Sequence, residues 1–324
     1  MTEGLTKPVN GFLAGYSFLK SSFAGRAMVY GMPPSIGTEL TNNCNLQCPE
    51  CSSGSGQMQR EHGFMDIELF KRVISELQPY LYYINLYFQG EPMLHPLFFS
   101  FLEYSSNIKT VISTNGHFLS EENAEKIARS GLKKLIISLD GIDQKTYSAY
   151  RINGSINTVL DGIGNIADAK KKFRSSLKIE IQFLVNKLNE NQIPQIRQLA
   201  EKLKSSLKLK SMEIINKENI VLWLPFNERF RRYKIKDGEY AVKNSLPGRC
   251  ARLWFNPVIT WDGKVIPCCF DKDAKYVMGD LNQESFSEIW NGTKYRLFRR
   301  VLLSDRSTTE ICRNCTSGLR GVII

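Results

Sequence analysis

Eight cysteines are the residues of this 324-residue chain whose type and spacing most clearly indicate chemistry. They fall into two groups, one near the start of the chain and one near its end: Cys44, Cys48, Cys51, Cys250, Cys268, Cys269, Cys312 and Cys315. The long stretch between Cys51 and Cys250 contains none. This grouping predicts two metal or redox sites and not a disulfide framework distributed over the fold.

The first group, Cys44, Cys48 and Cys51, has the spacing C-x3-C-x2-C and follows an apolar, β-branched run at residues 36–40. On a loop, three thiolates at this spacing supply one ligand fewer than a closed tetrahedral zinc site needs. A cluster held by three thiolates leaves one iron with an open position, which a catalytic metal centre requires. We therefore expect a catalytic centre just after the first strand.

The elements that must position this centre alternate between short apolar runs and helical patterns. The runs expected to form strands are 36–40, 83–88, 110–113, 134–139, 179–186 and 212–215, and the helical stretches are 66–80, 95–106, 121–131, 155–173 and 190–206. Such alternation predicts parallel βαβ units. Polar or glycine residues follow strands two, three and four, at the strand ends where a parallel barrel binds its ligands.

Four motifs in this order resemble the radical S-adenosylmethionine (radical SAM) superfamily. They are the C-x3-C-x2-C loop, Gly90-Glu91-Pro92, Ser113-Thr114-Asn115-Gly116 and Ser138-Leu139-Asp140-Gly141. The resemblance covers about residues 35–216 and implies an α/β fold, a partial (β/α)6 TIM barrel. It also implies a 4Fe-4S cluster that binds S-adenosylmethionine and an electron donor such as flavodoxin or ferredoxin. One electron then cleaves the cofactor to a 5′-deoxyadenosyl radical, which takes a hydrogen atom from the substrate.

Carried over position by position, the resemblance makes Cys44, Cys48 and Cys51 the ligands of this cluster. The residues it places around S-adenosylmethionine are Glu50, through its backbone, and Gly90, Glu91, Asn115, Ser138, Asp140 and Asn186. Glu50 departs from the family, which usually has an aromatic residue there, and this puts a side-chain contact to adenine in question. Arg151 is the candidate catalytic residue in contact with cofactor or substrate, and a structural ion pair is its alternative role.

The second group frames an expected hairpin at residues 258–267 that turns at Asp262-Gly263. This pattern resembles the SPASM domain or its shortened "twitch" form. The resemblance implies one auxiliary 4Fe-4S cluster for electron transfer, with four ligands: Cys250, Cys268, Cys312 and Cys315. Zinc is the alternative, because four thiolates suit it equally well. Cys269 is expected to be a packed small hydrophobe, since adjacent strand residues point to opposite faces.

Three domains are expected: an N-terminal helical extension at 1–34, the barrel at 35–218 and a SPASM/twitch-like domain at 219–324. Residues 11–19 predict a short packing or capping helix, with a membrane-surface helix as the alternative. They are too short to span a bilayer, so we expect a cytoplasmic protein with no membrane partner. The net charge of +11 lies mainly in the last third of the chain. It predicts a docking face for an acidic substrate more than for nucleic acid, since no recognition module accompanies the barrel.

The sequence thus predicts a radical SAM oxidoreductase or peptide-modifying enzyme that oxidises or cross-links its substrate, with the auxiliary cluster in electron transfer. Two substrate classes remain open, a ribosomally made peptide and a small sugar or aminocyclitol. The alternative class is a non-catalytic iron–sulfur or zinc protein that transfers electrons or binds a partner. Such a protein would need none of Gly90, Asn115 or Ser138.

Overall fold

The computed structural model describes residues 3–236, 238–243 and 246–315. Their packing divides the chain into two compact units that alternate along the sequence. Unit 1 consists of Met1–Asn43, Met58–Thr110 and Leu246–Cys315. Unit 2, within the described residues, consists of Cys44–Gln57 and Val111–Ser245.

Unit 2 is built on parallel strands. They are β3 (Lys109–Thr114), which enters this unit at Val111, β4 (Lys134–Ser138), β5 (Lys178–Val185) and β6 (Ser206–Ser211). The helices between and after them are α4 (Glu121–Arg129), α5 (Gln144–Tyr150), α6 (Ile156–Lys172) and α7 (Ile193–Lys202). Ser120, Asp143 and Ser155 each accept a hydrogen bond from the N–H three residues on, and so cap α4, α5 and α6.

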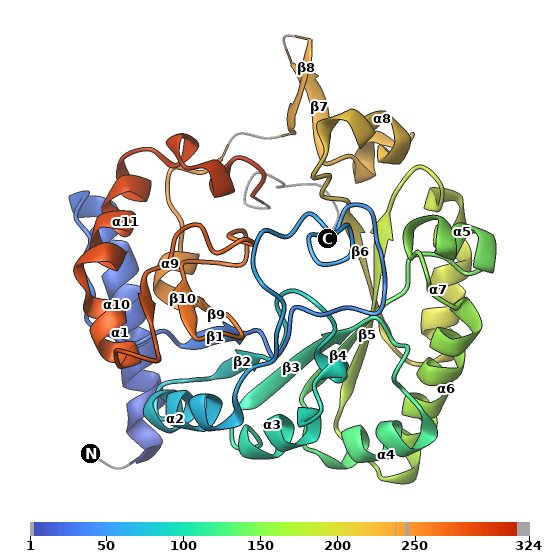
Figure 1. Ribbon diagram of the computed structural model, residues 1–324, viewed down its shortest axis with the longest axis horizontal. Coiled ribbons are helices and arrows are strands. Elements are labelled where there is room, and N and C mark those ends of the chain that lie inside the picture. Colours follow the sequence, from blue (N-terminus) through green and yellow to red (C-terminus); the bar gives the residue numbers. More distant parts are fainter. Residues whose placement is uncertain (1–2, 237, 244–245, 316–324) are drawn as a thin grey trace. The chain divides into compact units, whose positions relative to one another are not determined.

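Unit 1 contains a sheet in the order β11-β10-β9-β1-β2. Strand β1 (Ser35–Thr38) is parallel to β2 (Tyr83–Asn85) on one side and to β9 (Val258–Ile259) on the other. Strands β9, β10 (Lys264–Ile266) and β11 (Gly279–Asp280) are joined antiparallel, which confirms the expected hairpin. The helices of unit 1 are α1 (Glu3–Ala24), α2 (Ile67–Leu77), α3 (Phe98–Tyr104), α9 (Arg252–Phe255), α10 (Phe286–Asn291) and α11 (Thr293–Ser304) (Figure 1).

The sequence shows no regular pattern at residues 219–249, and the described residues up to 243 form short elements of unit 2. These are α8 (Ile220–Trp223) and the hairpin of β7 (Tyr233–Lys236) and β8 (Glu239–Val242). Short 3-10 turns complete the described chain: Pro92–Leu94, Glu190–Gln192, Lys217–Asn219, Glu228–Phe230, Arg306–Thr308 and Glu310–Cys312.

The expected α/β fold with a mostly parallel, unclosed barrel sheet is confirmed. The sixth strand, expected at 212–215, lies at Ser206–Ser211 instead. Lysines alternate with leucines in this strand, so its sequence lacks a strong apolar signal. Helices α10 and α11 are separated at Gly292. No helix among the described residues is long and apolar enough to cross a membrane.

Candidate functional site

The first three cysteines lie on an irregular loop between β1 and α2, within unit 2. Cys48 is buried, whereas Cys44 and Cys51 are half-buried. The N–H of Cys51 donates to the carbonyl of Cys48 (3.2 Å), and the N–H of Gly54 donates to that of Cys51 (3.1 Å). A Cβ at Gly54 would lie 2.6 Å from the backbone nitrogen of Cys48, so only glycine permits so tight a turn.

An apolar cluster of unit 2 supports this loop. Its buried members are Leu46, Cys48, Tyr150, Met212, Ile214, Ile220, Trp223 and Tyr233, and Cys44 and Cys51 pack against it. The cluster joins the cysteine loop to the part of the chain after β6, which holds five of these residues. The three thiols therefore lie at the edge of a water-poor region, where electrostatic interactions are stronger than in water.

Arg151 connects the loop to the end of β4. Its Nε donates to Asp140 Oδ2 (2.7 Å), and its Nη1 lies 3.8 Å from Cys48 Sγ. The other Asp140 oxygen, Oδ1, accepts from the N–H of Leu184 (2.7 Å), and the Asp140 side chain is only 1% exposed. Burial raises the pKa of the Cys48 thiol, and the Arg151 guanidinium opposes that rise. The structure thus brings three predicted residues, Cys48, Asp140 and Arg151, into one hydrogen-bonded chain.

Asn115 and Asn186, predicted at the ends of two strands, both make local contacts. Asn115 Nδ2 donates to Asn45 Oδ1 (2.7 Å), which ties the end of β3 to the residue after Cys44. Asn186 Oδ1 accepts from the N–H of Leu188 (2.9 Å), so this side chain shapes the turn after β5. Ser138, the last residue of β4, is buried.

Glu50 has a structural task that explains why a carboxylate stands there. Its Oε2 accepts from the N–H groups of Ile215 (2.7 Å) and Asn216 (3.2 Å), and its Oε1 accepts from Asn219 Nδ2 (2.7 Å). The carboxylate is buried, and its two oxygens accept these three hydrogen bonds. An aromatic ring at this position could not hold the segment after β6 in the same way.

Gly90 and Glu91 lie in unit 1, beside the chain that leads into the cysteine loop. Gly90 has φ +70°, and a Cβ there would lie 2.6 Å from the carbonyl oxygens of both Thr41 and Asn43. The Glu91 N–H donates to the Asn43 carbonyl (2.8 Å), and its side chain accepts from the N–H of Met93 (3.1 Å). Gly90 therefore packs closely against the backbone of unit 1, and its contact with S-adenosylmethionine stays a prediction.

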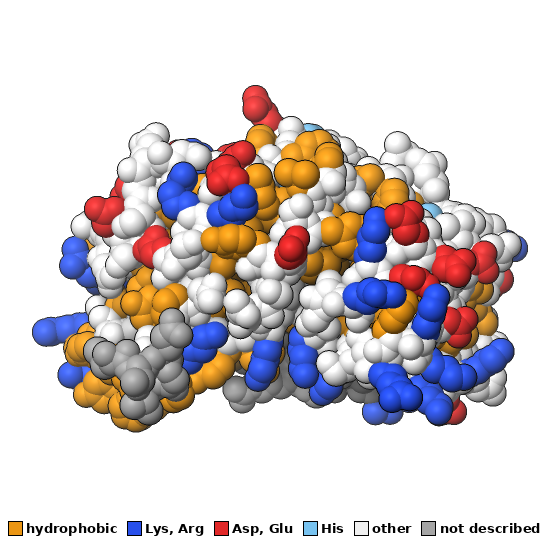
Figure 2. All heavy atoms as spheres, turned by 90° about the horizontal axis from the view of Figure 1, so that it is seen from below, with side chains coloured by type: hydrophobic (Ala, Val, Ile, Leu, Met, Phe, Trp, Pro, Cys, Tyr) orange, Lys and Arg blue, Asp and Glu red, His pale blue; other side chains and the backbone are white. Residues whose placement is uncertain are grey.

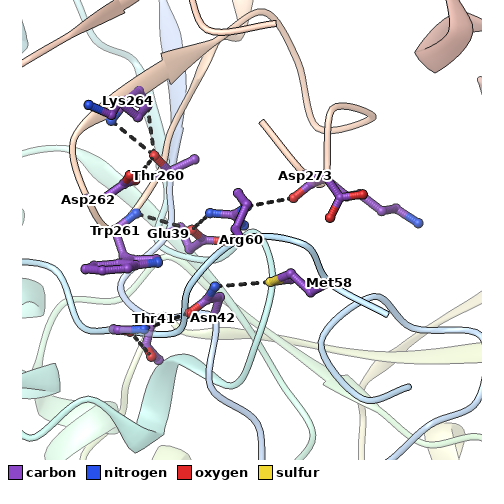
Figure 3. Close-up of polar contacts among 12 residues, drawn as sticks. Glu39, Thr41, Asn42, Met58, Arg60, Thr260, Trp261, Asp262, Lys264 and Asp273 are labelled. Atoms are coloured by element: carbon purple, nitrogen blue, oxygen red, sulfur yellow. Dashed lines mark hydrogen bonds and ion pairs between the residues drawn. The ribbon is translucent and has the colours of Figure 1, made fainter. Parts of the chain in front are cut away.

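The two ends of the cysteine loop are held together at its base (Figure 3). Glu39 and Arg60 form a two-pronged ion pair at 2.7 and 2.8 Å, in which the Glu39 side chain is fully buried. Asn42 accepts from the N–H of Gly63 (3.0 Å) and donates to the Glu61 carbonyl (2.8 Å). The N–H of Trp261, in the β9–β10 turn, also donates to Glu39 (3.2 Å). This "loop base", residues 39–43 and 58–63, fixes where the cysteine loop leaves and re-enters unit 1.

The four cysteines predicted as ligands of the second site are all buried and all lie in unit 1: Cys250, Cys268, Cys312 and Cys315. The N–H of Cys315 donates to the carbonyl of Cys312 (3.1 Å), which forms the C-x2-C turn. Burial raises the pKa of the Cys312 thiol; Arg306 opposes that rise, and the neighbouring Cys250 and Cys315 add to it. The fold therefore gathers thiols that are up to 65 residues apart in the sequence numbering.

Two arginines accompany these thiols. Arg306 Nη2 lies 3.6 Å from Cys315 Sγ, while its Nη1 donates to the carbonyls of Pro247 (2.9 Å) and Arg249 (3.0 Å). Arg252 Nη1 lies 3.2 Å from Cys269 Sγ. Cys269 is half-buried and accepts this charged hydrogen bond, so it is more than the packed hydrophobe expected. The sequence pattern missed both arginines, whose signal is their placement two residues after Cys250 and nine before Cys315.

These residues fit the groups that the motifs imply. All eight cysteines are thiols, and sets of three and four thiolates on loops and turns are the donor sets of 4Fe-4S clusters. The close backbone approaches at Gly54 and Gly90 leave no room for a side chain at either position. Among the described residues, no three His, Cys, Asp or Glu side chains come close enough together to hold a single metal ion.

Comparisons with known proteins agree with this arrangement. The radical SAM superfamily model matches residues 38–200, and the SPASM iron–sulfur cluster-binding domain matches residues 250–316. The chain is 24% identical to the S-adenosyl-L-methionine-dependent 2-deoxy-scyllo-inosamine dehydrogenase of Niallia circulans, over 87% of this chain and 92% of the relative. It is 26% identical to the tungsten-containing aldehyde ferredoxin oxidoreductase cofactor-modifying protein of Pyrococcus furiosus, over 81% and 82%.

Solved structures share the fold. BtrN in complex with AdoMet and 2-DOIA aligns with a TM-score of 0.56 and 22% identity, over 88% of this chain and 93% of BtrN. Streptococcus suis SuiB bound to its precursor peptide SuiA aligns with a TM-score of 0.64 and 14% identity, over 94% and 73%. With the two domains come S-adenosylmethionine and two 4Fe-4S clusters, one catalytic and one auxiliary. The chain is a member of the radical SAM superfamily and carries a SPASM domain at its C-terminal end.

Proposed function

We propose that this enzyme is a radical SAM dehydrogenase that oxidises a hydroxyl-bearing carbon of a small sugar or aminocyclitol. The observation that carries this proposal is the match to an aminocyclitol dehydrogenase along nearly the whole of both chains. The four buried thiols of the second site support it, because a dehydrogenation must dispose of an electron. A match to an enzyme over both domains also favours catalysis over an electron carrier or a zinc protein.

In this proposal the barrel, residues 35–218, binds and cleaves the cofactor. Cys44, Cys48 and Cys51 hold the catalytic cluster, which supplies the electron that converts S-adenosylmethionine to a hydrogen-abstracting radical. The residues that contact S-adenosylmethionine are Gly90, Glu91, Asn115, Ser138, Asp140, Asn186 and the backbone at Glu50. Arg151 acts as a positioning residue, because its guanidinium is already engaged by Asp140 and Cys48.

The C-terminal domain, residues 219–324, provides the second electron-transfer site. Cys250, Cys268, Cys312 and Cys315 hold the auxiliary cluster. The substrate carbon loses a hydrogen atom and its hydroxyl loses a proton, so a carbonyl forms and one electron remains to be accepted at the auxiliary site. The buried cation of Arg306 and the half-buried cation of Arg252 favour an added negative charge at that site.

A ribosomally made peptide is the second candidate substrate. The mycofactocin maturase MftC of Mycobacterium tuberculosis is 29% identical over 51% of this chain and 41% of the relative. The likeness of SuiB, solved with a precursor peptide, shows that this fold accommodates peptides in a relative. With a peptide substrate the same electron balance would give an oxidative cross-link in place of a carbonyl.

The remaining partners follow from the chemistry. A low-potential one-electron donor such as flavodoxin or ferredoxin would reduce the catalytic cluster. Eight thiols with no disulfide fit the reducing cytoplasm, which we propose as the compartment. Nucleic acid is not among the proposed partners. Two of the basic residues in the last third of the chain, Arg252 and Arg306, lie beside cysteine thiols.

The test uses the full chain, reconstituted anaerobically with iron and sulfide. We expect about eight irons per chain and formation of 5′-deoxyadenosine under dithionite. Incubation with a panel of aminocyclitols and sugars deuterated at each carbinol carbon would transfer deuterium into 5′-deoxyadenosine for the true substrate class. A panel of cysteine-containing and unmodified precursor peptides serves as the parallel arm.

Two results would overturn this function. Binding of about four irons per chain, together with full turnover by the Cys312→Ala variant, would show that no auxiliary cluster accepts the electron. Absence of 5′-deoxyadenosine in a fully loaded protein would favour the electron carrier. The Cys269→Ala variant is the matched control, since it removes a thiol of the same region that the proposal does not count as a ligand.

A further inference from the structure

The N-terminal helix α1 is inverted: it buries small and polar residues and exposes most of its large apolar ones, with Leu13 and Phe18 half-buried. Asn10, Ala14, Ser17 and Ser21 are at most 4% exposed. Their side chains hold the returning segment 28–32 by its backbone: Asn10 bonds both the N–H and the carbonyl of Met32, and Ser17 accepts from the N–H of Tyr30. Phe18 adds a ring contact with Trp254 (5.6 Å between centroids), so α1 is anchored to unit 1 by these polar bonds and by Phe18, without the large apolar residues of its other face.

The opposite face carries a continuous apolar stripe. Its members follow one another at intervals of three and four residues, and their exposed fractions are Val9 48%, Phe12 72%, Tyr16 43%, Leu19 53% and Phe23 79%. We call these five residues the outer stripe. Figure 2 shows hydrophobic side chains in several groups across one face of the molecule, one of them at its lower left edge. A contiguous exposed stripe of this kind marks an interaction surface, since single exposed apolar residues are ordinary but aligned ones are not.

The charge around the outer stripe is of one sign. No Asp or Glu occurs from Gly4 to Thr38, whereas Lys7, Lys20 and Arg26 do. Lys20 and Arg26 are exposed, and the guanidinium of Arg249 lies 5.1 Å from the ring centroid of Phe23. The partner that fits this surface is therefore apolar where it meets the rings and anionic where it meets the cations.

We propose that α1 lies on the surface of an anionic lipid membrane, with the outer stripe in the acyl boundary and its cations among the headgroups. Aromatic and leucine side chains on one helix face, bordered by Lys and Arg, are the pattern of helices that lie in the membrane interface. The cytoplasmic leaflet provides the anionic headgroups. This revises the expectation of a merely packing helix without a membrane partner and is independent of the substrate.

A second copy of this chain fits the stripe less well. Pairing two α1 helices would bring Lys7 and Lys20 of each copy close to those of the other, with no carboxylate between Gly4 and Thr38 to balance them. An acidic protein partner satisfies the charges, but nothing in the spacing of the stripe selects one over a lipid surface. A second copy and an acidic protein are therefore alternatives that the experiment separates from a lipid surface.

The experiment measures co-sedimentation of the full, cluster-loaded chain with phosphatidylcholine vesicles and with vesicles of phosphatidylcholine and phosphatidylglycerol. We expect binding to the anionic vesicles that weakens as salt is raised, and at least fivefold less to the neutral ones. The F12S/F23S variant should lose at least fivefold of the binding. Its matched control is F226S/L222S, which removes side chains of similar exposure (68% and 53%) from unit 2 and should bind as the original chain does.

A charge arm completes the test. K20E/R26E should lose binding to anionic vesicles, whereas K234E/K236E, which changes the net charge equally on exposed residues of β7, should keep most of it. Equal binding to neutral vesicles, or no loss in F12S/F23S, would overturn the proposal. So would a dimer in light scattering that F12S/F23S converts to a monomer, with no vesicle binding, because the stripe would then cover a second copy. Circular dichroism and iron content confirm that each variant is folded.

Discussion

Replacing Arg151 by methionine tests whether this arginine positions Asp140. Asp140 is 1% exposed, and its carboxylate has two partners, the Arg151 guanidinium and the Leu184 N–H. Without Arg151 the buried Asp140 carboxylate keeps the Leu184 N–H, a neutral donor, as its partner. Removing one partner of a buried ion pair costs about 3–5 kcal/mol. Because the Arg151 side chain is 16% exposed and water reaches it in part, we take about 3 kcal/mol, at the lower end of that range.

Hydrogen exchange measured by mass spectrometry on peptides containing Leu184 would detect this loss of local stability, because the Leu184 N–H donates to Asp140. When the free energy of local opening falls by about 3 kcal/mol, hydrogen exchange becomes about 100-fold faster. The D140N/R151M double variant should recover most of the protection, since a neutral amide leaves no buried charge. The control is Lys126→Met, which breaks the exposed pair with Glu122 and should cost under about 1 kcal/mol.

The idea that Arg151 positions Asp140 fails if exchange in Arg151→Met stays within threefold of the Lys126→Met control. It also fails if the double variant exchanges as fast as the single one. In the first case Asp140 would have enough support without Arg151, and a direct contact of Arg151 with cofactor or substrate would become the better explanation of its place.

Three further predictions rest on other parts of the chain. Gly54→Ala should lower iron retention of the first cluster several-fold in chelator challenge, because its Cβ would collide with the Cys48 backbone; unchanged retention would show that the turn can relax. Burial lowers the pKa of His95 below its usual 6.5. The unfolded chain therefore takes up the proton first, and the free energy of unfolding falls as the pH drops below about 6.5. In urea titrations the His95→Gln variant should show a smaller decrease of the unfolding free energy over this pH range. Arg306→Met should lower the auxiliary cluster's reduction potential by on the order of 100 mV in EPR-monitored titrations, whereas the exposed Arg300→Met should not, and equal potentials would contradict the role of Arg306.

The barrel could be predicted from sequence because its strands and helices carry strong periodic signals. Strands β1 to β5 lie where apolar, β-branched runs occur, and α2, α4 and α6 begin at polar capping residues. Strand β6 was misplaced because its buried positions alternate with lysines. The two cysteine groups could be predicted equally well, because each depends on residue type and local spacing.

The contacts that hold these groups could not be predicted in the same way. The pair of Glu39 and Arg60 joins residues 21 apart across the cysteine loop, and nothing in their local spacing marks them as partners. The bonds from Glu50 to Ile215 and Asn216 span more than 160 positions. Likewise, the inversion of α1 depends on which of its faces the returning segment 28–32 covers, and both faces have helical periodicity.

The order of the strands in unit 1 has a consequence for how the chain is made. Strand β1 is among the first elements synthesised, yet one of its two edges is covered by β9, which begins at Val258. Until that residue has left the ribosome, β1 presents an unpaired edge, which is a template for pairing with other chains. A chain truncated before the SPASM hairpin would therefore leave this edge of β1 open, and we expect it to aggregate more readily than the full chain.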